Sequence, residues 1–424
     1  MRILIKNGRV IDPKMGMDTV NDVFIVAGKI IAIGAGPDGF QANQVIDAKG
    51  LVVCPGLVDL SVRLREPGLE YKATLESEMR AAVAGGVTSL ACPPDTDPPL
   101  DEPGLVEMLK HRAKSLNQAH VYPIGALTQG LKGDRLTEMA ELHDAGCIAF
   151  GQSDKQLLDT RVMLRAMQYA STFGFSVWLS PEDAGIANSG VAHDGEVATR
   201  LGLPAIPVCA ETIAISSIVL IARETGAKVH LCRVSSAEGV AMVRAARQQG
   251  LPITCDVAAN YIHLSEMDIS FFDSNCHLVP PLRGLSDRDA LRAGLIDGTI
   301  DAICSDHAPV DEDAKLLPFG ESEAGSTGLE LLLSLILKWA TEMKIPLVVA
   351  LAKITSEPAK LLGVEAGHLS LGAAADLCIF DPGQYWKVEA MSLKSQGKNT
   401  PFLGMELQGR VKYTLADGVV VYED

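Results

Sequence analysis

The residues around position 60 combine a strand pattern with charged side chains that could do chemistry. Residues 58–68 (VDLSVRLREPG) follow a short apolar run and the turn pair Pro55-Gly56, which predicts a buried strand running into a loop. Alternate side chains of a strand share one face. The four that we expect to point the same way are Asp59, Ser61, Arg63 and Arg65. A core strand with a charged end places that end in a pocket or in water.

Polar residues also follow several later apolar runs. They are Asp95, the segment Gln152-Ser153-Asp154, Ser180, Arg233 and the segment Ser305-Asp306-His307. If these runs are parallel strands of one barrel, their carboxyl ends meet at a single face, where barrel enzymes carry their catalytic residues. The strand ends therefore form one candidate site.

The apolar runs alternate with helical patterns through the middle of the chain. The predicted strands are 57–63, 87–92, 120–126, 147–151, 176–180, 228–234, 252–257 and 301–305. Asp101 is a plausible N-cap before Pro103, and an apolar stripe at helical spacing runs from Met163 to Phe173. Eight strands alternating with helices match an α/β fold of the (β/α)8 TIM-like barrel type, although periodicity alone leaves an open α/β sheet possible.

Both ends of the chain have a different pattern. Short strands separated by turns occupy residues 1–54 and recur in the tail, where Asp417-Gly418 is predicted as a hairpin turn. We therefore predict one small β-sandwich domain assembled from both termini, residues 1–54 and 365–424. The barrel is predicted to span residues 55–364.

Composition excludes several classes of protein. The chain has 424 residues, 47% of them hydrophobic, and no apolar run approaches the length of a membrane span. No signal-peptide pattern is present at the N-terminus, so we expect a cytoplasmic protein. A net charge of −16 argues against nucleic-acid binding. The nine cysteines include no Cys-x-x-Cys pair and are expected to be reduced and mostly buried.

Residues 58–68 resemble the dihydroorotase and cyclic-amidohydrolase signature Asp-x-His-x-His-Leu-Arg-Glu-Pro-Gly. In that family the two His bind zinc and the Arg binds the substrate carboxylate. This chain keeps the frame, with Arg65 at the Arg position, but has Ser61 and Arg63 where the two His belong. The resemblance extends over essentially the full length and favours a barrel over an open sheet.

Further strand ends resemble family blocks in which metal ligands have also changed. Gln152 and Ser153 replace an acidic pair, Ser180 replaces one His and Arg233 replaces another. Asp154 follows the acidic-pair position, and we do not expect it to compensate. His230, three residues before Arg233, is interpreted as a hydrogen-bonded core residue that points to the other face.

One block matches the family closely. Residues 300–309 contain Asp306 at the position that binds metal and moves the proton in active relatives. Asp306 and Arg65 are therefore interpreted as vestigial site residues. Pro94-Asp95 lies where the family has a substrate-binding Asn, and we interpret it as part of a rigid proline-rich loop.

These replacements oppose metal chemistry. A catalytic zinc needs about three protein ligands and an open position. One Arg about 4 Å from a unit positive charge adds a repulsion of about 4 kcal/mol at an effective dielectric of roughly 20, and it cannot lose its proton. We expect no metal, no cofactor and no catalytic residue, and hence no dihydroorotase activity. Arg63 and Arg233 should point into the barrel mouth, and at least one should pair with Asp306.

Three functions are compatible with this pattern. The favoured one is a catalytically inactive dihydroorotase homologue, similar to the non-catalytic subunits that assemble with bacterial aspartate transcarbamoylase in pyrimidine biosynthesis. That resemblance implies the transcarbamoylase catalytic subunit as partner and a homodimer within a larger complex. The second is an active cyclic amidohydrolase with a rebuilt or metal-free site that uses Arg65 and Asp306. The third is a sensor that binds a pyrimidine intermediate without turning it over.

Overall fold

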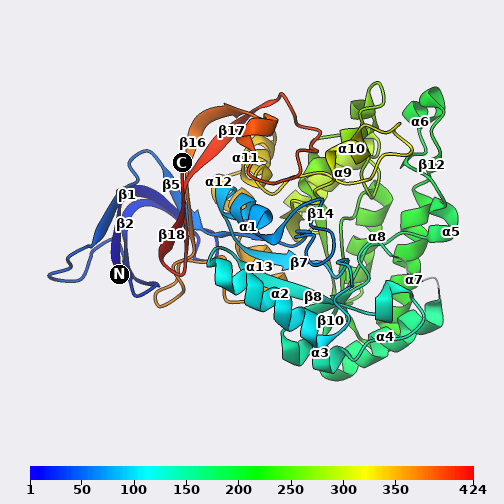
Figure 1. The fold of residues 1–424 in the computed structure, drawn as a ribbon, viewed down its shortest axis with the longest axis horizontal. Coiled ribbons are helices and arrows are strands. Elements are labelled where there is room, and N and C mark those ends of the chain that lie inside the picture. Colours follow the sequence, from blue (N-terminus) through cyan, green and yellow to red (C-terminus); the bar gives the residue numbers. More distant parts are fainter. Residues whose placement is uncertain (156, 158) are drawn as a thin grey trace.

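The computed structural model describes residues 1–155, 157 and 159–424. Two structural units are visible in Figure 1: a large barrel with its helices, and a sheet that contains both chain termini. The barrel is built from the middle of the chain and the sheet from its two ends, as predicted.

The barrel consists of eight parallel strands in sequence order. They are β6 (Leu57–Asp59), β7 (Val87–Cys92), β8 (His120–Ala126), β9 (Ala149–Gly151), β10 (Ser176–Leu179), β13 (Lys228–Leu231), β14 (Ile253–Ala258) and β15 (Ala302–Cys304). The first and last strands meet just beyond their ends, where Val62 and His307 form an isolated parallel bridge. The Arg63 N–H donates to the His307 carbonyl at 2.9 Å, and the His307 N–H donates to the Ser61 carbonyl at 3.0 Å. These bonds close the barrel at its carboxyl end, which confirms the predicted fold.

Two strands are shorter than predicted. β6 ends at Asp59, so strict alternation does not extend to Arg65, whose φ of 60° turns the chain away. β13 ends at Leu231, because Arg233 has a φ of 56° and cannot continue a strand. In both places the backbone turns where the candidate site begins.

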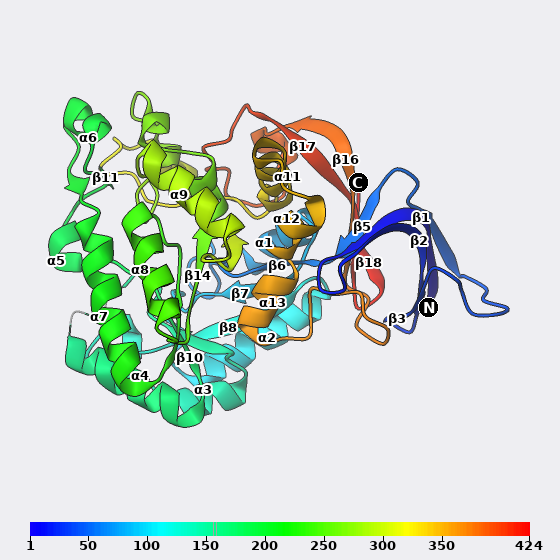
Figure 2. The same ribbon diagram turned by 180° about the vertical axis from the view of Figure 1, so that it is seen from behind.

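Helices cover the outside of the barrel, with α2, α3 and α4 along the lower edge of Figure 1 and α7, α8 and α9 side by side in Figure 2. The longer helices are α1 (Leu75–Ala84), α2 (Pro103–Leu116), α3 (Met139–Ala145), α4 (Thr160–Phe173), α7 (Cys209–Thr225), α8 (Ala237–Gln248), α9 (Leu285–Ile296), α11 (Leu332–Met343) and α13 (Ser356–Leu362). Shorter elements are α5 (Ala184–Ala187), β11 (Ala192–His193), α6 (Glu196–Leu201), β12 (Ala205–Ile206), α10 (Glu312–Lys315) and α12 (Leu347–Ala352). Single 3-10 turns are η1 (Gln129–Leu131), η2 (Ala259–Ile262), η3 (Glu266–Ile269), η4 (Ser274–Cys276) and η5 (Ala390–Ser392).

Two helix details differ from expectation. The N-cap of α2 is Glu102, while the Asp101 carboxylate accepts a hydrogen bond from the Gly130 N–H at 2.7 Å. Asp101 was therefore wrong as a cap, since its side chain ties the helix start to another loop. The stripe on α4 is buried as predicted from Met163 to Ala170, but Phe173 at its end is 54% exposed.

The terminal strands form one continuous sheet. Its members are β1 (Arg2–Asp12), β2 (Met17–Val26), β3 (Lys29–Ile33), β4 (Gln44–Asp47), β5 (Val52–Pro55), β16 (Leu377–Lys387), β17 (Glu406–Ala416) and β18 (Val419–Glu423). The hydrogen-bonded order is β18-β17-β16-β5-β1-β2-β3, with β4 on β1, so the strands predicted as a sandwich share a single sheet. Side chains from both termini fill its core, Ile5 and Ile379 among them. The Asp417-Gly418 hairpin turn is confirmed, with φ of 49° and 69°.

Two predictions from composition can be compared with the structure. All nine cysteines are free thiols, and seven of them are buried, as expected; Cys209 is exposed and Cys232 partly exposed. In the described part of the chain, every helix is too short or too polar to cross a bilayer.

Candidate functional site

Two arginines and one aspartate meet at the mouth of the barrel. Arg63 Nη1 lies 3.3 Å from Asp306 Oδ1, and Arg233 Nη1 lies 3.1 Å from the same oxygen. All three residues are at least nine-tenths buried. The prediction that a guanidinium pairs with Asp306 is confirmed for both arginines. Each guanidinium comes from a position where the resembling family has a metal-binding His.

Two further aspartates complete this network. Arg63 Nε lies 2.7 Å from Asp95 Oδ2, and its Nη2 lies 2.6 Å from Asp154 Oδ2. Arg233 pairs with the other oxygen of Asp154. Asp154 therefore takes a place in the site as the partner of two guanidiniums, a role that the sequence did not predict. The loop interpretation of Asp95 missed its role as a counter-ion. We call Arg63, Arg233, Asp95, Asp154 and Asp306 the mouth network.

The charges of the mouth network reinforce one another. Burial opposes ionisation of Asp154, yet the charges of Arg233 and Arg63 lower the pKa of its carboxyl group to about 2. For Asp95, burial is likewise outweighed, mainly by Arg63, so its pKa is also lowered. Both groups are therefore carboxylates at neutral pH. Each arginine has at least two carboxyl groups as partners, and such pairing is the condition under which buried charges are tolerated.

Arg65 lies beside the network but outside it. Its Nε donates to the Pro309 carbonyl at 3.0 Å, and Arg65 is only 8% exposed. Burial, followed by the charge of Arg63, lowers the pKa of Arg65. With Arg65 included, the mouth contains three arginines and three aspartates.

Gly68, three residues further along, lets a neighbouring loop come close. Its φ is +90°, and a Cβ there would lie 1.8 Å from the Asp97 carbonyl oxygen.

The other predicted positions contribute differently. The Ser61 hydroxyl donates to Asp306 Oδ1 at 3.2 Å, and the Ser180 hydroxyl accepts from Arg233 Nη2 at 2.6 Å. Ser153 Oγ lies 3.4 Å from Arg63 Nη2. Gln152 does not join this group, because its amide donates to the buried hydroxyl of Thr128 at 2.7 Å. Serines at former ligand positions thus act as small hydrogen-bonding partners of the ion pairs.

The backbone around these side chains is strained. Ser153, Arg233 and Asp306 have φ of 53°, 56° and 49°, a left-handed conformation that non-glycine residues seldom adopt. Such residues typically cost about 1–3 kcal/mol each and cluster at active sites and ligand clamps. The backbone is therefore typical of an active site, although the side chains it holds are not.

A group of fully buried ionisable side chains lies directly beside the mouth network. The fully buried Glu78 carboxylate lies 2.5 Å from His307 Nε2 and also accepts a hydrogen bond from the Ser395 hydroxyl at 2.7 Å. Asp59 Oδ1 accepts from the Ser305 N–H at 3.0 Å, across the gap between the first and last strands. We call Asp59, Glu78 and His307 the closure layer, because they hold the strand ends that close the barrel. Burial raises the pKa of Asp59 to about 6.

His230 is a hydrogen-bonded core residue, as predicted. Its Nδ1 lies 2.9 Å from Thr254 Oγ1, and its Nε2 lies 3.3 Å from Asp256 Oδ2. It is not remote from the site, however, because the other oxygen of Asp256 accepts the backbone N–H of Arg233 at 2.5 Å. His230 and Asp256 together support the turn that aims Arg233 at the mouth.

Little space remains at the mouth. The cavity lined by Ser61, Arg63, Ser180 and Arg233 has a volume of about 30 Å³. One water requires at least about 10–15 Å³, whereas small-molecule sites usually enclose about 300–1,000 Å³. The ion pairs therefore leave room at the mouth for about two water molecules and not for a small-molecule ligand.

The residues present do not fit zinc, the metal that the family resemblance implies. Of the former ligand positions, Asp306 alone keeps a ligand side chain, and two guanidiniums already share its carboxylate. Within the described residues, the one cluster of at least three His, Cys, Asp or Glu whose ligand atoms lie within 4.8 Å of one another is His120, Asp376 and Asp417. His120 begins β8, so that cluster lies at the opposite end of the barrel.

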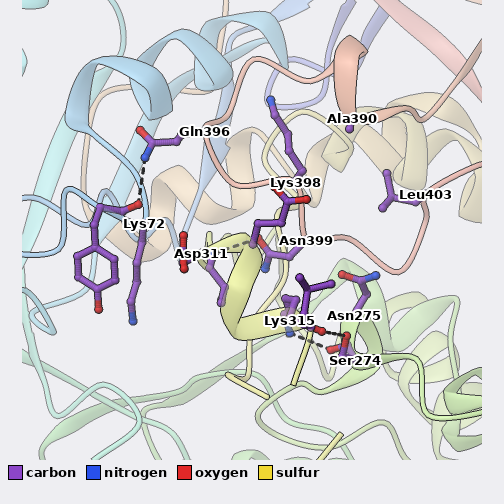
Figure 3. Close-up of a pocket in the computed structure, with 14 residues that line it drawn as sticks. Lys72, Ser274, Asn275, Asp311, Lys315, Ala390, Gln396, Lys398, Asn399 and Leu403 are labelled. Atoms are coloured by element: carbon purple, nitrogen blue, oxygen red, sulfur yellow. Dashed lines mark hydrogen bonds between the residues drawn. The ribbon is translucent and has the colours of Figure 1, made fainter. Parts of the chain in front are cut away.

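A larger cavity of about 550 Å³ is lined by other residues than those of the mouth network (Figure 3). Its lining includes Lys72, Lys315 and Lys398, but their ammonium groups do not converge on one point. Lys72 pairs with an acidic side chain, and the other two donate to backbone carbonyls. The cavity therefore has the size of a binding site without a catalytic arrangement.

Comparisons with known proteins agree with this geometry. The profile described as Dihydro-orotase-like matches residues 50–239, and that of the Amidohydrolase family matches residues 195–422. A "Dihydroorotase-like protein" of Pseudomonas putida is 46% identical over 100% of this chain and 99% of its own length. A "Dihydroorotase" of Citrifermentans bemidjiense is 42% identical over 100% of both chains.

The solved structures show the same architecture. The L-hydantoinase (dihydropyrimidinase) of Arthrobacter aurescens is 25% identical, with a TM-score of 0.89 over 99% of this chain and 96% of that one. Profile, sequence and structure thus point to one family. The chain is a dihydroorotase-like member of the amidohydrolase family.

Proposed function

We propose that this chain is a catalytically inactive dihydroorotase homologue that serves as a structural subunit of a cytoplasmic aspartate transcarbamoylase complex in pyrimidine biosynthesis. The main support for the proposed loss of activity is the pairing of Arg63 and Arg233 with Asp306. Two guanidiniums occupy the positions from which the family's His residues would bind metal. The remaining carboxylate is already neutralised.

The chemistry of amide hydrolysis explains why this arrangement is inactive. The reaction needs an activated water and a polarised carbonyl, both of which a metal ion supplies in this family. A cation at the mouth would face the guanidiniums of Arg63 and Arg233 at close range. A substrate would need the space that the ion pairs fill, since the cavity measures about 30 Å³.

A structural role follows from what the chain keeps. The barrel, its closure layer and the terminal sheet are complete, although the site has lost its ligand set. A stable fold without its chemistry is useful through its surface. The partner that we propose is the transcarbamoylase catalytic subunit, which makes the compound that an active dihydroorotase would cyclise, and this chain acts there as a homodimer. The "Dihydroorotase-like protein" names of the Pseudomonas relatives agree with a protein set apart from active dihydroorotases.

A second candidate is an active cyclic amidohydrolase, which the name "Dihydroorotase" of relatives at 42% identity favours. In that case Arg65 would bind a carboxylate and Asp306 would move a proton without metal. The third hypothesis, a pyrimidine-intermediate sensor, has no support from the mouth, where the cavity is far smaller than a ligand site.

The decisive experiment expresses the transcarbamoylase of the same organism with and without this chain. We expect a mixed complex by size exclusion with light scattering, and lower stability or activity of the transcarbamoylase alone. The same preparation should not hydrolyse dihydroorotate. Unchanged transcarbamoylase size and activity would refute the structural role, and turnover abolished by Asp306→Ala would refute the loss of catalysis.

A further inference from the structure

Two neighbouring loops expose five large apolar side chains. Residues 263–276 carry Met267, Phe271 and Phe272, which are 52%, 87% and 41% exposed. Residues 310–325 carry Leu316 and Leu317, which are 77% and 47% exposed. We call these five residues the apolar ridge. Single exposed apolar residues are ordinary, but a group this size on adjoining loops is typical of an interaction site.

The loops that carry the ridge are locked together. The Ser274 hydroxyl donates to the Lys315 carbonyl at 2.6 Å, and the Lys315 ammonium donates to the Ser274 carbonyl at 2.9 Å. A third contact joins His277 Nδ1 to Ser322 Oγ at 3.0 Å. The ridge is therefore preformed, so a partner would lose little free energy in ordering it.

The backbone of the first loop is strained at the residues on either side of Phe271. Ser270 and Phe272 have φ of 49° and 65°, and such a value is a clear outlier for a bulky residue. Each left-handed residue costs about 1–3 kcal/mol and persists where the surroundings enforce it. Phe271 stands between these two residues and is the most exposed of the five.

The rim of the ridge is acidic. Apart from His263, the two loops carry one basic side chain, Lys315, which is buried, and eight carboxylates that are exposed or partly exposed. These carboxylates are Glu266, Asp268, Asp273, Asp311, Glu312, Asp313, Glu321 and Glu323. An apolar centre inside an acidic rim fits a protein surface whose own apolar centre is surrounded by Lys and Arg. It repels nucleic acid and anionic lipid.

The cavity of Figure 3 continues this surface. Ser274, Asn275 and Lys315 line one side of it, and Gln396, Lys398 and Leu403 line the other. Leu403, which is 41% exposed, adds an apolar side chain on the far side of the cavity. A volume of about 550 Å³ can receive a protruding side chain or loop of a partner.

We propose that the apolar ridge and the adjoining cavity form the docking surface for the transcarbamoylase catalytic subunit, through a patch on it with an apolar centre and a basic rim. This assignment rests on the function proposed above. A second copy of this chain is the less suitable occupant, because a two-fold contact places identical patches opposite one another. Here that would bring two acidic rims together.

The test compares two double variants in the co-expressed complex. Phe271→Ser with Leu316→Ser removes the two most exposed ridge residues. Ile213→Ser with Leu220→Ser makes the same chemical change on α7, where these residues are 43% and 60% exposed. We expect the ridge variant to weaken the complex about 30-fold or more, as for interface hot spots, and the α7 variant to bind as the wild type. A charge reversal, Asp268→Lys with Asp273→Lys, should slow association and reduce its salt dependence.

The outcomes separate the surface from the proposed function. If the wild-type complex forms and the ridge variant binds equally well, the docking surface is wrong while the structural role stands. If the wild type forms no complex, the structural role and this occupant both fail. If the chain alone forms a homodimer that the ridge variant abolishes, the occupant is a second copy and the assignment is overturned. Thermal unfolding of each variant alone checks that it is folded.

Discussion

The mouth network and the closure layer are two groups of ionisable side chains at the same end of the barrel, yet they differ in the groups that they bind. In the closure layer, Asp59, Glu78 and His307 bind backbone and side-chain groups that join the first and last strands. In the mouth network, Arg63 and Arg233 mainly bind carboxylates. The closure layer therefore maintains the fold, whereas the side chains of the mouth network mainly form ion pairs with one another.

This difference shows which part of an enzyme site belongs to the fold. Arg233 and Asp306 keep the left-handed backbone typical of active sites, although their side chains now form an ion pair. The strain is enforced by the surrounding hydrogen bonds, including that of Asp256 to the Arg233 N–H. We therefore expect substitutions at the mouth to be tolerated where the charges stay balanced, and substitutions of the groups that close the barrel to be more harmful.

The largest effect should come from breaking the closure layer. Glu78→Leu removes a fully buried carboxylate and leaves His307, the Ser395 hydroxyl and the Gln396 N–H without their acceptor. We expect the free energy of unfolding to fall by about 3–5 kcal/mol. Denaturant unfolding measures it. Glu76→Leu, on the exposed face of the same helix, is the control and should change stability by less than about 1 kcal/mol.

Breaking the mouth network should cost less. Arg233→Met leaves Asp154 and Asp306 with Arg63 as their remaining cation, and the Asp154 side chain keeps 35% exposure to water. We expect a loss of about 2–4 kcal/mol, part of which Asp306→Asn in the same chain should restore by removing an unpaired charge. A loss as large as that of Glu78→Leu, or no recovery in the double variant, would contradict the proposed difference between the two groups.

Much of the fold could be predicted from the sequence, because strands and helices differ in hydrophobic period. The eight barrel strands and the Asp417-Gly418 turn were found in this way. The ends of β6 and β13 could not be placed, since the left-handed backbone at Arg65 and Arg233 depends on tertiary contacts. Such residues carry no periodic signal of their own.

The site was predicted only in part. Arg63, Arg233 and Asp306 were identified from the motifs, but Asp95 and Asp154 were given no role. Loop paths have no period from which they can be inferred. Charge balance could have supplied the missing signal, because two buried arginines need more than one carboxylate. Asp95 follows β7 and Asp154 follows β9, with β8 between them in the barrel, so both lie at its carboxyl end and were available as partners.

The pH dependence of stability distinguishes Asp59 of the closure layer from Asp154 of the mouth network. The pKa of Asp59 is about 6 in the folded chain and about 4 in an unfolded one, so between these values the folded state binds one more proton. Stability should therefore rise by about 2 kcal/mol as pH falls from above 6 to 4, and Asp59→Asn should remove this rise. Asp154, with a pKa of about 2, acts in the opposite direction below pH 4, where its protonation destabilises the fold. Denaturant unfolding at several pH values, comparing wild type with Asp59→Asn, measures both; an identical pH profile for the two proteins would refute the assignment to Asp59.

The smallest expected effect concerns catalysis itself. Arg63→His alone should restore neither zinc binding nor dihydroorotate hydrolysis, because Ser61 and Ser180 still provide no ligand and the guanidinium of Arg233 still lies 3.1 Å from Asp306. A catalytic zinc needs about three protein ligands at once. Restoring a single ligand is therefore not expected to give even a small increase in the rate of hydrolysis. Elemental analysis should be repeated in a His120→Asn background, since His120, Asp376 and Asp417 could bind metal at the other end of the barrel. One equivalent of zinc that persists in this background and disappears with Asp306→Asn would contradict this prediction. It would show that fewer substitutions are needed for zinc to bind at the mouth than the ion pairs indicate. Single substitutions at the mouth should therefore change stability measurably while activity stays at background.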